Sequence, residues 1–340
     1  MQNFPTDVLK EWFLTNRRDL PWRKNPTPYQ VWISEVMLQQ TQVSVVIPYF
    51  EKWMNTFPSI QSLAEAPLEQ VLKCWEGLGY YSRARNLHKG AQVIVENFGG
   101  ELPNHPLSLS QVPGIGPYTK GALLSFAFRQ KAAAVDGNVL RVLSRFLGCV
   151  EEIDLPHVKK KLQNYAEEML PNTEPWLVVE GLIELGALVC GKIAKCDGCP
   201  LKKKCDAYRH QLQDLIPKRR ARLETIELIR QVAVIHYQGL YAVQKGRQGK
   251  LMADLYEFPY LECHHFKNVE DFEKAWGMPL KYQKSLQTQS HTFTRYRARL
   301  FPHLLEACGY SENYQWKTIA EMKQLPFSSG HKRILTQLTL

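Results

Sequence analysis

Two acidic residues of this chain have neighbours that would suit them to acid–base chemistry. Glu35 lies in the stretch YQVWISEVMLQQTQV, which as a helix is apolar on nearly every side, and such a helix is expected to be buried. A carboxyl held there has its charged form disfavoured, so its pKa should rise into the range of a general acid. The other interpretation places Glu35 at a gap that faces solvent, and the residues alone do not decide between the two.

The second acid is Asp136, which follows the apolar run AAAV and precedes the predicted helix GNVLRVLSRF. Asp is among the residues preferred at a helix N-cap, and taken alone the position favours that role. The alternative is a carboxylate held at the mouth of a cleft.

Half of the cysteines are gathered in residues 190–205, CGKIAKCDGCPLKKKC. The x5, x2, x5 spacing is compact and asymmetric, whereas zinc usually takes two C-x2-C pairs separated by a longer insert. The spacing is closer to that of a [4Fe–4S] cluster, with zinc and a structural or redox role as open alternatives. The candidate ligands are Cys190, Cys196, Cys199 and Cys205. The scattered cysteines are expected to be buried small hydrophobes: Cys74, Cys149, Cys263 and Cys308.

A glycine turn lies between two apolar stretches in LSQVPGIGPYTKGALLSFAF. Gly114 and Gly116 are followed by Pro117, which is favoured at the first position of a helix. Such a helix start exposes backbone N–H groups and a positive dipole end, where a phosphate can bind. A plain turn between helices is the other interpretation. Combined with the basic charge of the chain, the pattern favours phosphate contact, which would position DNA without reading its sequence.

These residues must be positioned by two kinds of structure. Residues 6–205 show helical periodicity broken by Pro and Gly, residues 206–226 are polar and basic, and the period then changes. We therefore predict an all-α catalytic domain over 1–205, a linker over 206–226 and a smaller α+β domain over 227–340.

Within the predicted C-terminal domain, two segments show strand-like alternation. RQVAVIHYQGLYAVQKG alternates apolar and polar residues around Gln238-Gly239, which predicts a hairpin. SHTFTRYRARLFPHLL alternates as well. Segments 269–276 and 331–338 are predicted to be short helices.

The composition favours a polyanionic partner. The net charge is +10, and the excess is partly local, in Lys202–Lys204 and in 218–222; a solvated linker is the alternative to nucleic acid. No long apolar run and no leader pattern is present, so we expect a cytoplasmic protein whose clustered cysteines favour metal over disulfide.

Five ordered motifs closely resemble the helix-hairpin-helix DNA glycosylases that have an iron–sulfur cluster. The motifs are LPWRKNPTPYQVWISEVMLQQTQ, GLGYYSRARNLHKGA, VPGIGPYTKGALLSFAF, VDGNVLRVLSRF and the cysteine group. They span nearly all of residues 8–205, with the helix-hairpin-helix at about 107–129. Within that superfamily, SEVMLQQTQV and GLGYYSRARNLH resemble the adenine glycosylases that act opposite 8-oxoguanine.

The resemblance implies roles for individual residues at the reacting centre. Glu35 matches the glutamate that protonates adenine N7 and handles the attacking water, and Asp136 matches the aspartate that stabilises the oxocarbenium-like sugar. Tyr118 falls where bifunctional relatives have a Schiff-base lysine, which implies a monofunctional enzyme, and in the family it supports Asp136. Asn138 is also implied to be catalytic. Lys120 lies on a different helix face from Tyr118 and is expected to contact phosphate or solvent.

Other matches concern the flipped base and its partner strand. The residues implied are Arg23 and Glu180 in the adenine pocket, Gln40 and Tyr80 as insertions into the base stack, and Thr41 and Leu78 as 8-oxoguanine contacts. One turn beyond Glu180, Glu184 is expected on a solvated helix face. The aromatic residues Trp22, Trp32 and Tyr81 are expected to be packing.

The C-terminal residues resemble a Nudix-like domain through LYEFP and SHTFTRY. They lack a glutamate-rich phosphohydrolase motif, so a reader of 8-oxoguanine is expected. The contact loop is Phe293-Thr294-Arg295, where the family has Phe-Ser-His; Arg295 brings a fixed charge that should favour phosphate contact. Two further departures are the x5 spacing after Cys190, which the family usually has as x6, and the lack of glycines in KLMADLYEFP.

The sequence therefore predicts a monomeric, monofunctional glycosylase that removes adenine from A:8-oxoguanine and A:G pairs in double-stranded DNA, with a structural [4Fe–4S] cluster and no membrane. Two rivals remain. One is a bifunctional glycosylase/lyase for oxidised pyrimidines, and the other is a non-enzymatic DNA-binding module with a structural metal site.

Overall fold

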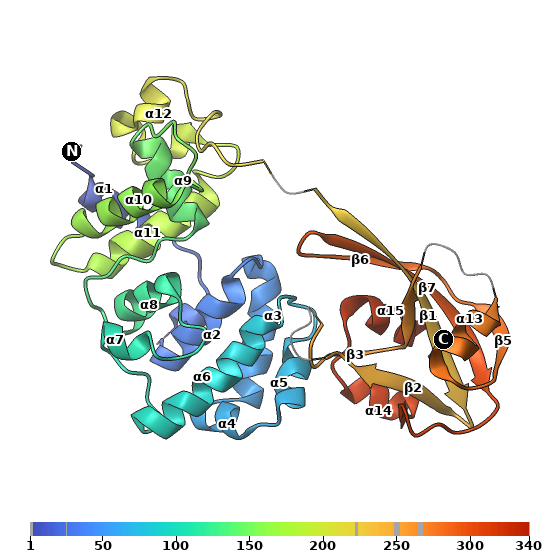
Figure 1. The fold of residues 1–340 in the computed structure, drawn as a ribbon. Coiled ribbons are helices and arrows are strands. Elements are labelled where there is room, and N and C mark those ends of the chain that lie inside the picture. Colours follow the sequence, from blue (N-terminus) through green and yellow to red (C-terminus); the bar gives the residue numbers. More distant parts are fainter. Residues whose placement is uncertain (1–2, 25, 222–223, 248–251, 264–267, 340) are drawn as a thin grey trace. The chain divides into compact units, whose positions relative to one another are not determined.

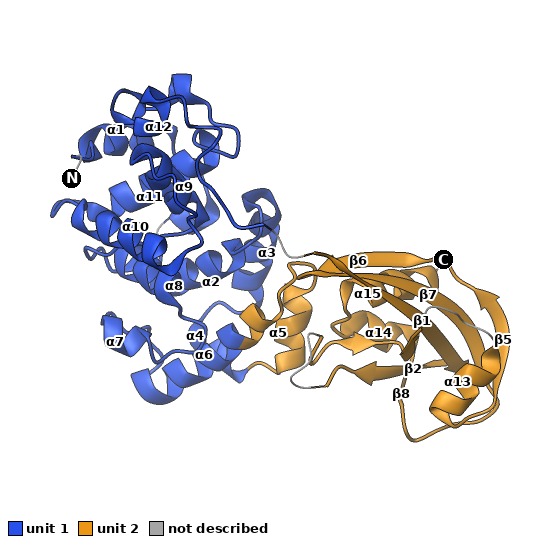
Figure 2. Cartoon of the chain, turned by 45° about the horizontal axis from the view of Figure 1, so that its top comes forward, with its two compact units in different colours: residues 1–65, 86–221 blue, residues 66–85, 222–340 orange. Residues whose placement is uncertain are grey.

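The protein folds into two compact units, shown in separate colours in Figure 2. One comprises residues 1–65 and 86–221, and the other residues 66–85 and 222–340. The computed structural model describes residues 3–24, 26–221, 224–247, 252–263 and 268–339. Within these ranges no helix is long and apolar enough to cross a membrane.

The first unit is built from helices and short helical turns (Figure 1). Its α-helices are α1 (Thr6–Asn16), α2 (Pro28–Leu38), α3 (Val43–Thr56), α4 (Ile60–Glu65), α7 (Pro106–Leu109), α8 (Pro117–Ala122), α9 (Gly137–Phe146), α10 (Pro156–Glu168), α11 (Pro175–Leu188) and α12 (Asp206–Arg209). Two helices involve residues 66–85 of the second unit: α5 (Leu68–Trp75) and the start of α6 (Ser82–Phe98).

Helix α2 is buried along almost its whole length, as its apolar residues predict. Thr27 starts the helix with a capping box: its side chain accepts from the backbone of Gln30, whose side chain bonds back to Thr27. Trp32 and Ile33 are fully buried. The same packing surrounds Glu35, which is only 8% exposed.

The glycine turn joins α7 to α8 in a helix-hairpin-helix. Gly114 has φ +84°, and a side chain there would place its Cβ 2.7 Å from Cβ of Asn86, so only glycine is suited to this position. Gly116 is the N-cap of α8 and Pro117 its first residue. A single π-helical turn, Leu123–Ala127, continues from α8.

Residues 206–221 pack on the helical unit instead of forming a free connection. Ile216 is buried and its carbonyl accepts from Nε of Arg145 at 2.7 Å. The backbone N–H of Ile153 donates to the carbonyl of Lys218 at 3.0 Å. The predicted linker 206–226 thus contains helix α12 and packed backbone, and the first strand begins at its last residue; Arg222 and Leu223 lie outside the described residues.

The C-terminal residues form an eight-stranded mixed sheet. Its main path is β3-β2-β1-β7-β5, with β4 beside β1, β6 beside β7 and β8 beside β2. Strands β1 and β7 are parallel, whereas the other pairs are antiparallel. The strands are β1 (Ile226–Tyr237), β2 (Leu240–Lys245), β3 (Tyr256–Glu257), β4 (Tyr260–Glu262), β5 (Leu280–Ser285), β6 (Gln289–Phe293), β7 (Tyr296–Ala307) and β8 (Gln315–Lys317).

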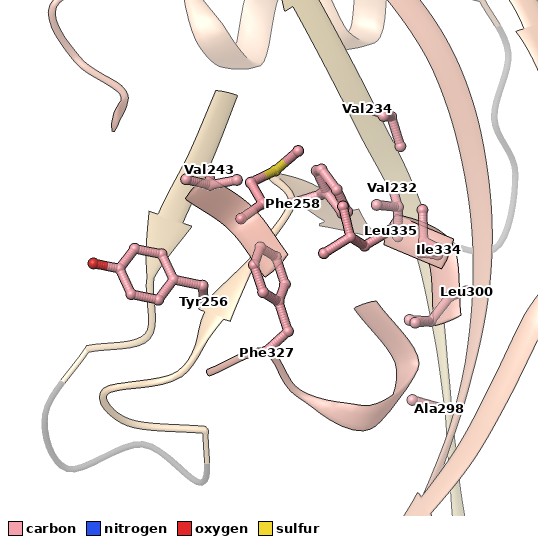
Figure 3. Packing of buried hydrophobic residues seen from close by; sticks show 11 residues of the cluster. Val232, Val234, Val243, Tyr256, Phe258, Ala298, Leu300, Phe327, Ile334 and Leu335 are labelled. Atoms are coloured by element: carbon pink, nitrogen blue, oxygen red, sulfur yellow. The ribbon is translucent and has the colours of Figure 1, made fainter. Parts of the chain in front are cut away.

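Both faces of β1 are covered, which corrects the predicted alternation of core and solvent. Val232 and Val234 pack in one core with Ile334 of α15 (Ser329–Gln337) (Figure 3). Ala233 and Ile235 pack in a second core with α13 (Val269–Trp276). Because alternate residues enter two apolar layers, the strand is buried continuously from Arg230 to Ile235.

The predicted hairpin and helices of this unit are confirmed. Gln238 and Gly239 both have positive φ and join β1 to β2, and α13 and α15 lie where short helices were expected. The expectation for the scattered cysteines is correct only for Cys74. Cys308 is exposed, and Cys149 and Cys263 are half-buried.

Candidate active site

Glu35 is a buried carboxyl held by a phenol. The Tyr118 hydroxyl donates to its Oε2 at 2.5 Å. Burial raises the pKa of Glu35 to about 7, and the hydrogen bond from Tyr118 partly opposes this rise. Burial also raises the pKa of Tyr118 well above its usual range, so the phenol remains a neutral donor. Glu35 can therefore hold a proton near neutral pH, and of its two oxygens Oε1 is the one not engaged by Tyr118.

Asp136 is both a helix cap and a residue of the cleft, so its two interpretations are compatible. Its Oδ1 accepts from the backbone N–H groups of Asn138 and Val139 at 2.9 and 2.8 Å, which caps α9. Its Oδ2 accepts from Nδ2 of Asn138 at 2.7 Å. Burial raises the pKa of Asp136, although these hydrogen bonds favour the ionised form.

A cleft of about 1340 Å³ brings most of the predicted residues of the helical unit together. The predicted site residues in its lining are Glu35, Asp136, Tyr118, Asn138, Arg23, Glu180, Gln40 and Thr41. The aromatic residues Trp22, Trp32 and Tyr81 are buried, as expected for packing.

The resemblance predicts that Tyr118 supports Asp136, whereas its hydroxyl hydrogen-bonds to Glu35. Gln39 was not predicted; it lines the cleft and donates to Thr119 at 3.2 Å.

One wall of the cleft is an ion-pair network that the sequence does not predict. Glu184 is fully buried, which overturns the expected solvated face. Its carboxylate accepts from Arg18 Nε at 2.7 Å and from Arg23 Nη2 at 3.0 Å. Arg23 in turn approaches Glu180 with its Nε, at 3.3 Å. Glu184 thus holds Arg18 and Arg23, which both line the cleft.

The two glutamates of this network have opposite electrostatics. Burial would raise the pKa of Glu184, but the hydrogen bond from Arg18 and the charge of Arg23 outweigh it and lower the pKa to about 2. Burial raises the pKa of Glu180 despite Arg23 and Arg129. Glu184 is therefore the permanent counter-ion, whereas Glu180 in the cleft lining takes up a proton more readily. Arg129, which also approaches Glu180, lies over the ring of Trp176 at 4.9 Å.

Substituting Glu184→Gln is expected to destabilise the helical unit by about 3 kcal/mol, because Arg18 and Arg23 lose their buried counter-ion. The ionised carboxylate stabilises the fold fully above pH 4.5, and this contribution is lost as pH falls toward 2. Denaturant unfolding measures both. The control is Glu174→Gln, which alters a 49%-exposed partner of Lys10 at 3.8 Å and should change stability by less than about 1 kcal/mol. Equal effects of the two changes would contradict the network.

Asn138 connects the acid to neighbouring helices. Its Oδ1 accepts from Arg141 Nη2 at 2.7 Å, and Arg141 also donates to the carbonyls of Gly186 and Cys190 at 2.8 and 2.7 Å. Helix α11 approaches so closely that a Cβ on Gly186 would lie 2.6 Å from Cβ of Asn138. The position of the Asp136 cap is therefore set by packing as well as by hydrogen bonds.

The four clustered cysteines line one small cavity beside α9. Arg145 Nη1 lies 3.4 Å from Sγ of Cys190, and Cys205 Sγ donates to the carbonyl of Arg145 at 3.4 Å. All eight cysteines of the chain are free thiols. Within the described ranges no three His, Cys, Asp or Glu side chains converge to hold a single ion. Although these side chains do not converge on a single ion, four cysteines around one cavity match the four-cysteine ligand set of an iron–sulfur cluster.

The remaining predicted residues of the helical unit are at its surface. Gly116 is open, with no atom near its missing side chain, and Lys120 Nζ donates to Ser110 at 3.0 Å on the hairpin. Gln40 is exposed with φ +59°.

Five predicted contact residues belong to the second unit and not to the unit of the cleft. Leu78 is buried, whereas Tyr80 is 46% exposed and has φ +48°. Thr294 and Arg295 form the turn between β6 and β7, with Thr294 at φ +49° and both side chains exposed. Phe293 stacks on His291 with ring centroids 5.0 Å apart. The backbone of LYEFP includes β3, and Lys250 and Leu251 before it lie outside the described residues.

The rate of an acid-catalysed step at Glu35 is expected to fall as pH rises above about 7, because the proton is then lost. It should also fall at low pH, where Asp136 is protonated. Tyr118→Phe removes a hydrogen bond that lowers the pKa of Glu35, so the alkaline limb should move to higher pH. Single-turnover rates across pH measure both limbs. An alkaline limb that stays in place in Tyr118→Phe would contradict the assignment.

The comparisons identify the class of protein. Residues 33–168 match the HhH-GPD superfamily of base excision DNA repair proteins, and residues 231–337 match the NUDIX domain. A helix-hairpin-helix unit with a buried acid and a capping aspartate in one cleft, followed by a Nudix-like sheet domain, defines a DNA glycosylase of base excision repair. The predicted helix-hairpin-helix domain followed by a Nudix-like domain is thereby confirmed, and the iron–sulfur loop stays a prediction.

Two relatives that match along most of their length identify the family within this class. The chain is 34% identical over 309 residues to an adenine DNA glycosylase of Buchnera aphidicola subsp. Schizaphis graminum, covering 91% of this chain and 88% of the relative. It is 37% identical over 315 residues to that of Buchnera aphidicola subsp. Acyrthosiphon pisum, covering 91% and 89%. The chain belongs to the adenine DNA glycosylase family.

A solved structure agrees with the helical fold. A thermostable thymine-DNA glycosylase is 29% identical, with a TM-score of 0.56 over 60% of this chain and 95% of that one.

Proposed function

We propose that this protein hydrolyses the N-glycosidic bond of adenine paired with 8-oxoguanine, and with guanine, without cutting the DNA strand. The observation that supports this most is the Glu35–Tyr118 pair. A carboxyl with a pKa of about 7 faces a cleft, and a phenol stands where bifunctional relatives have a lysine.

The proposed reaction uses the two acids in turn. Glu35 gives a proton to N7 of a flipped-out adenine, which makes the base a better leaving group when the C1′–N9 bond breaks. Asp136 in its ionised form stabilises the positive charge on the sugar. Water then adds to C1′, and its proton passes to the carboxylate of Glu35. Asn138 keeps the carboxylate of Asp136 in place through its amide.

Recognition is proposed to come from both units. Arg23 and Glu180 would line the adenine pocket, where their ion pair supplies both donors and acceptors. The other proposed DNA contacts are Gln40, Thr41, Leu78, Tyr80, Gly114, Gly116, Lys120, Phe293, Thr294 and Arg295. The net charge of +10 supports a DNA partner, and free thiols support a cytoplasmic location. We propose that the protein acts as a monomer.

We further propose that Cys190, Cys196, Cys199 and Cys205 hold a [4Fe–4S] cluster with a structural role, since glycosidic hydrolysis needs no electron transfer. The purified protein should be brown, with about four iron per chain. Replacing Cys199 by Ser should reduce iron content and the stability of α9 and the cysteine loop. Stoichiometric zinc without iron would contradict this proposal.

The experiment that tests the function compares single-turnover base release from A:8-oxoguanine, A:G and thymine glycol duplexes, with borohydride trapping in parallel. Adenine release without a trapped enzyme–DNA adduct is expected. Thymine glycol excision with an adduct at Lys120 would instead identify a bifunctional glycosylase/lyase.

A further inference from the structure

We propose that Glu76 is a positioning residue that ties the loop of residues 77–80 to the C-terminal sheet domain. Through it, preference for the lesion would depend on how well that domain holds the loop. This inference rests on the proposed contacts of Leu78 and Tyr80 with DNA. It adds a residue that contacts neither DNA nor the reacting base.

Glu76 follows α5 directly, and its side chain is 5% exposed. Its Oε1 accepts from the backbone N–H of Phe327 at 3.0 Å. Its Oε2 accepts from Lys73 Nζ at 3.0 Å and from Lys332 Nζ of α15. Phe327 is itself fully buried in the core of the sheet domain (Figure 3). A buried carboxylate with one backbone and two ammonium donors is a fixed attachment point.

Three further contacts attach the same segment to the sheet domain. Tyr256 donates its hydroxyl to Glu69 at 2.8 Å, and Lys245 reaches the same oxygen at 2.9 Å. After the loop, Arg85 Nη1 donates to the carbonyl of Ala253 at 2.8 Å. Residues 66–85 are thus attached before and after the loop, and they belong to the same compact unit as the C-terminal residues.

The loop itself is internally braced. Trp75 Nε1 donates to the carbonyl of Gly79 at 3.0 Å. Arg83 Nη2 donates to the carbonyls of Leu78 and Gly79, both at 3.1 Å, and its guanidinium lies over the Tyr80 ring at 5.7 Å. Because these contacts connect the loop to Trp75, the neighbour of Glu76, we expect a shift of Glu76 to be passed on to Tyr80.

Loss of the Glu76 charge should affect lesion recognition more than chemistry. Glu35 and Asp136 lie in the other unit. Their hydrogen bonds come from Tyr118 and from Asn138, which belong to that unit as well. The rate on A:G, where no 8-oxoguanine is present to contact the loop, should therefore change little. The preference for A:8-oxoguanine over A:G should fall.

The test measures single-turnover rates and duplex affinities on A:8-oxoguanine and A:G for Glu76→Gln. We expect the preference for A:8-oxoguanine to drop about tenfold, with the A:G rate within about twofold of the unchanged protein. The matched control is Glu270→Gln in α13 of the same unit, which removes the same charge from an exposed side chain and should leave the preference within about twofold. Lys332→Met removes one of the donors to Glu76 named above and should give a smaller drop of about threefold. Lys332→Met also tests the role of Glu76 if the Glu76→Gln protein does not fold.

Tyr80→Ala distinguishes a wrong role for Glu76 from a wrong proposed function. If Tyr80→Ala lowers the preference but Glu76→Gln and Lys332→Met do not, the role of Glu76 is wrong while the proposed function stands. If Tyr80→Ala leaves the preference unchanged, or the unchanged protein has none, the proposed contacts are wrong and the inference fails with them.

Discussion

Glu35→Gln is expected to bind adenine-containing mismatch DNA and to release no measurable adenine. The amide has nearly the volume of the carboxyl and can still accept the hydrogen bond from Tyr118 that Oε2 accepts now. It has no proton to give to the base, and general acid catalysis contributes about 10²–10⁴ in rate. Single-turnover excision, together with affinity for the same duplex, measures the two effects separately.

The stability of Glu35→Gln provides the control. The buried carboxyl has a raised pKa, so its ionised form is disfavoured by the fold. Replacing it with a neutral amide should therefore leave the free energy of unfolding unchanged or slightly higher at neutral pH. Near-normal excision by a folded Glu35→Gln protein would remove Glu35 from the reaction and with it the proposed mechanism.

Asp136→Asn is expected to lower the excision rate by about 10²–10³ while leaving helix α9 intact. The side chain of Asn caps a helix about as well as that of Asp, so the bonds from the backbone of Asn138 and Val139 can persist. The negative charge is lost, and a charge placed at a developing cation is worth several kcal/mol in a buried site. Single-turnover excision on A:8-oxoguanine measures the change.

Asp136→Ala separates the cap from the charge. It should also destabilise the protein by about 1 kcal/mol, because the cap is lost. If Asp136→Asn excises adenine normally and only Asp136→Ala is impaired, Asp136 is a cap and the electrostatic role is wrong.

The sequence predicts that the helix of Glu35 is buried, but it does not predict that Tyr118 is the hydrogen-bond partner of Glu35. Eleven residues of α2 that are apolar on nearly all sides require a buried helix, and this burial raises the pKa. Whether Glu35 faces solvent or a cleft depends on residues 83 positions away, and local periodicity has no information at that range. The N-cap role of Asp136 is local and was predictable, whereas its place in the cleft was not.

The helical pattern predicted a solvated position for Glu184, and this prediction is wrong. The sequence places it one turn from Glu180, which is typical of a solvated face, but its partner Arg18 is 166 positions away. A charged residue is expected on a surface unless a partner is known. A similar limit applies to β1, where the pattern of a strand does not tell how many of its faces will be covered.

The close approach of Gly186 to Asn138 determines which substitutions this position tolerates. Similarity between amino acids would rank Gly186→Ala as one of the mildest changes in the chain. The added methyl would need space already taken by Cβ of Asn138, the residue whose amide holds Asp136. A substitution at such a site belongs with substitutions of the acids themselves, because the severity of a change follows from the atoms that the new side chain meets.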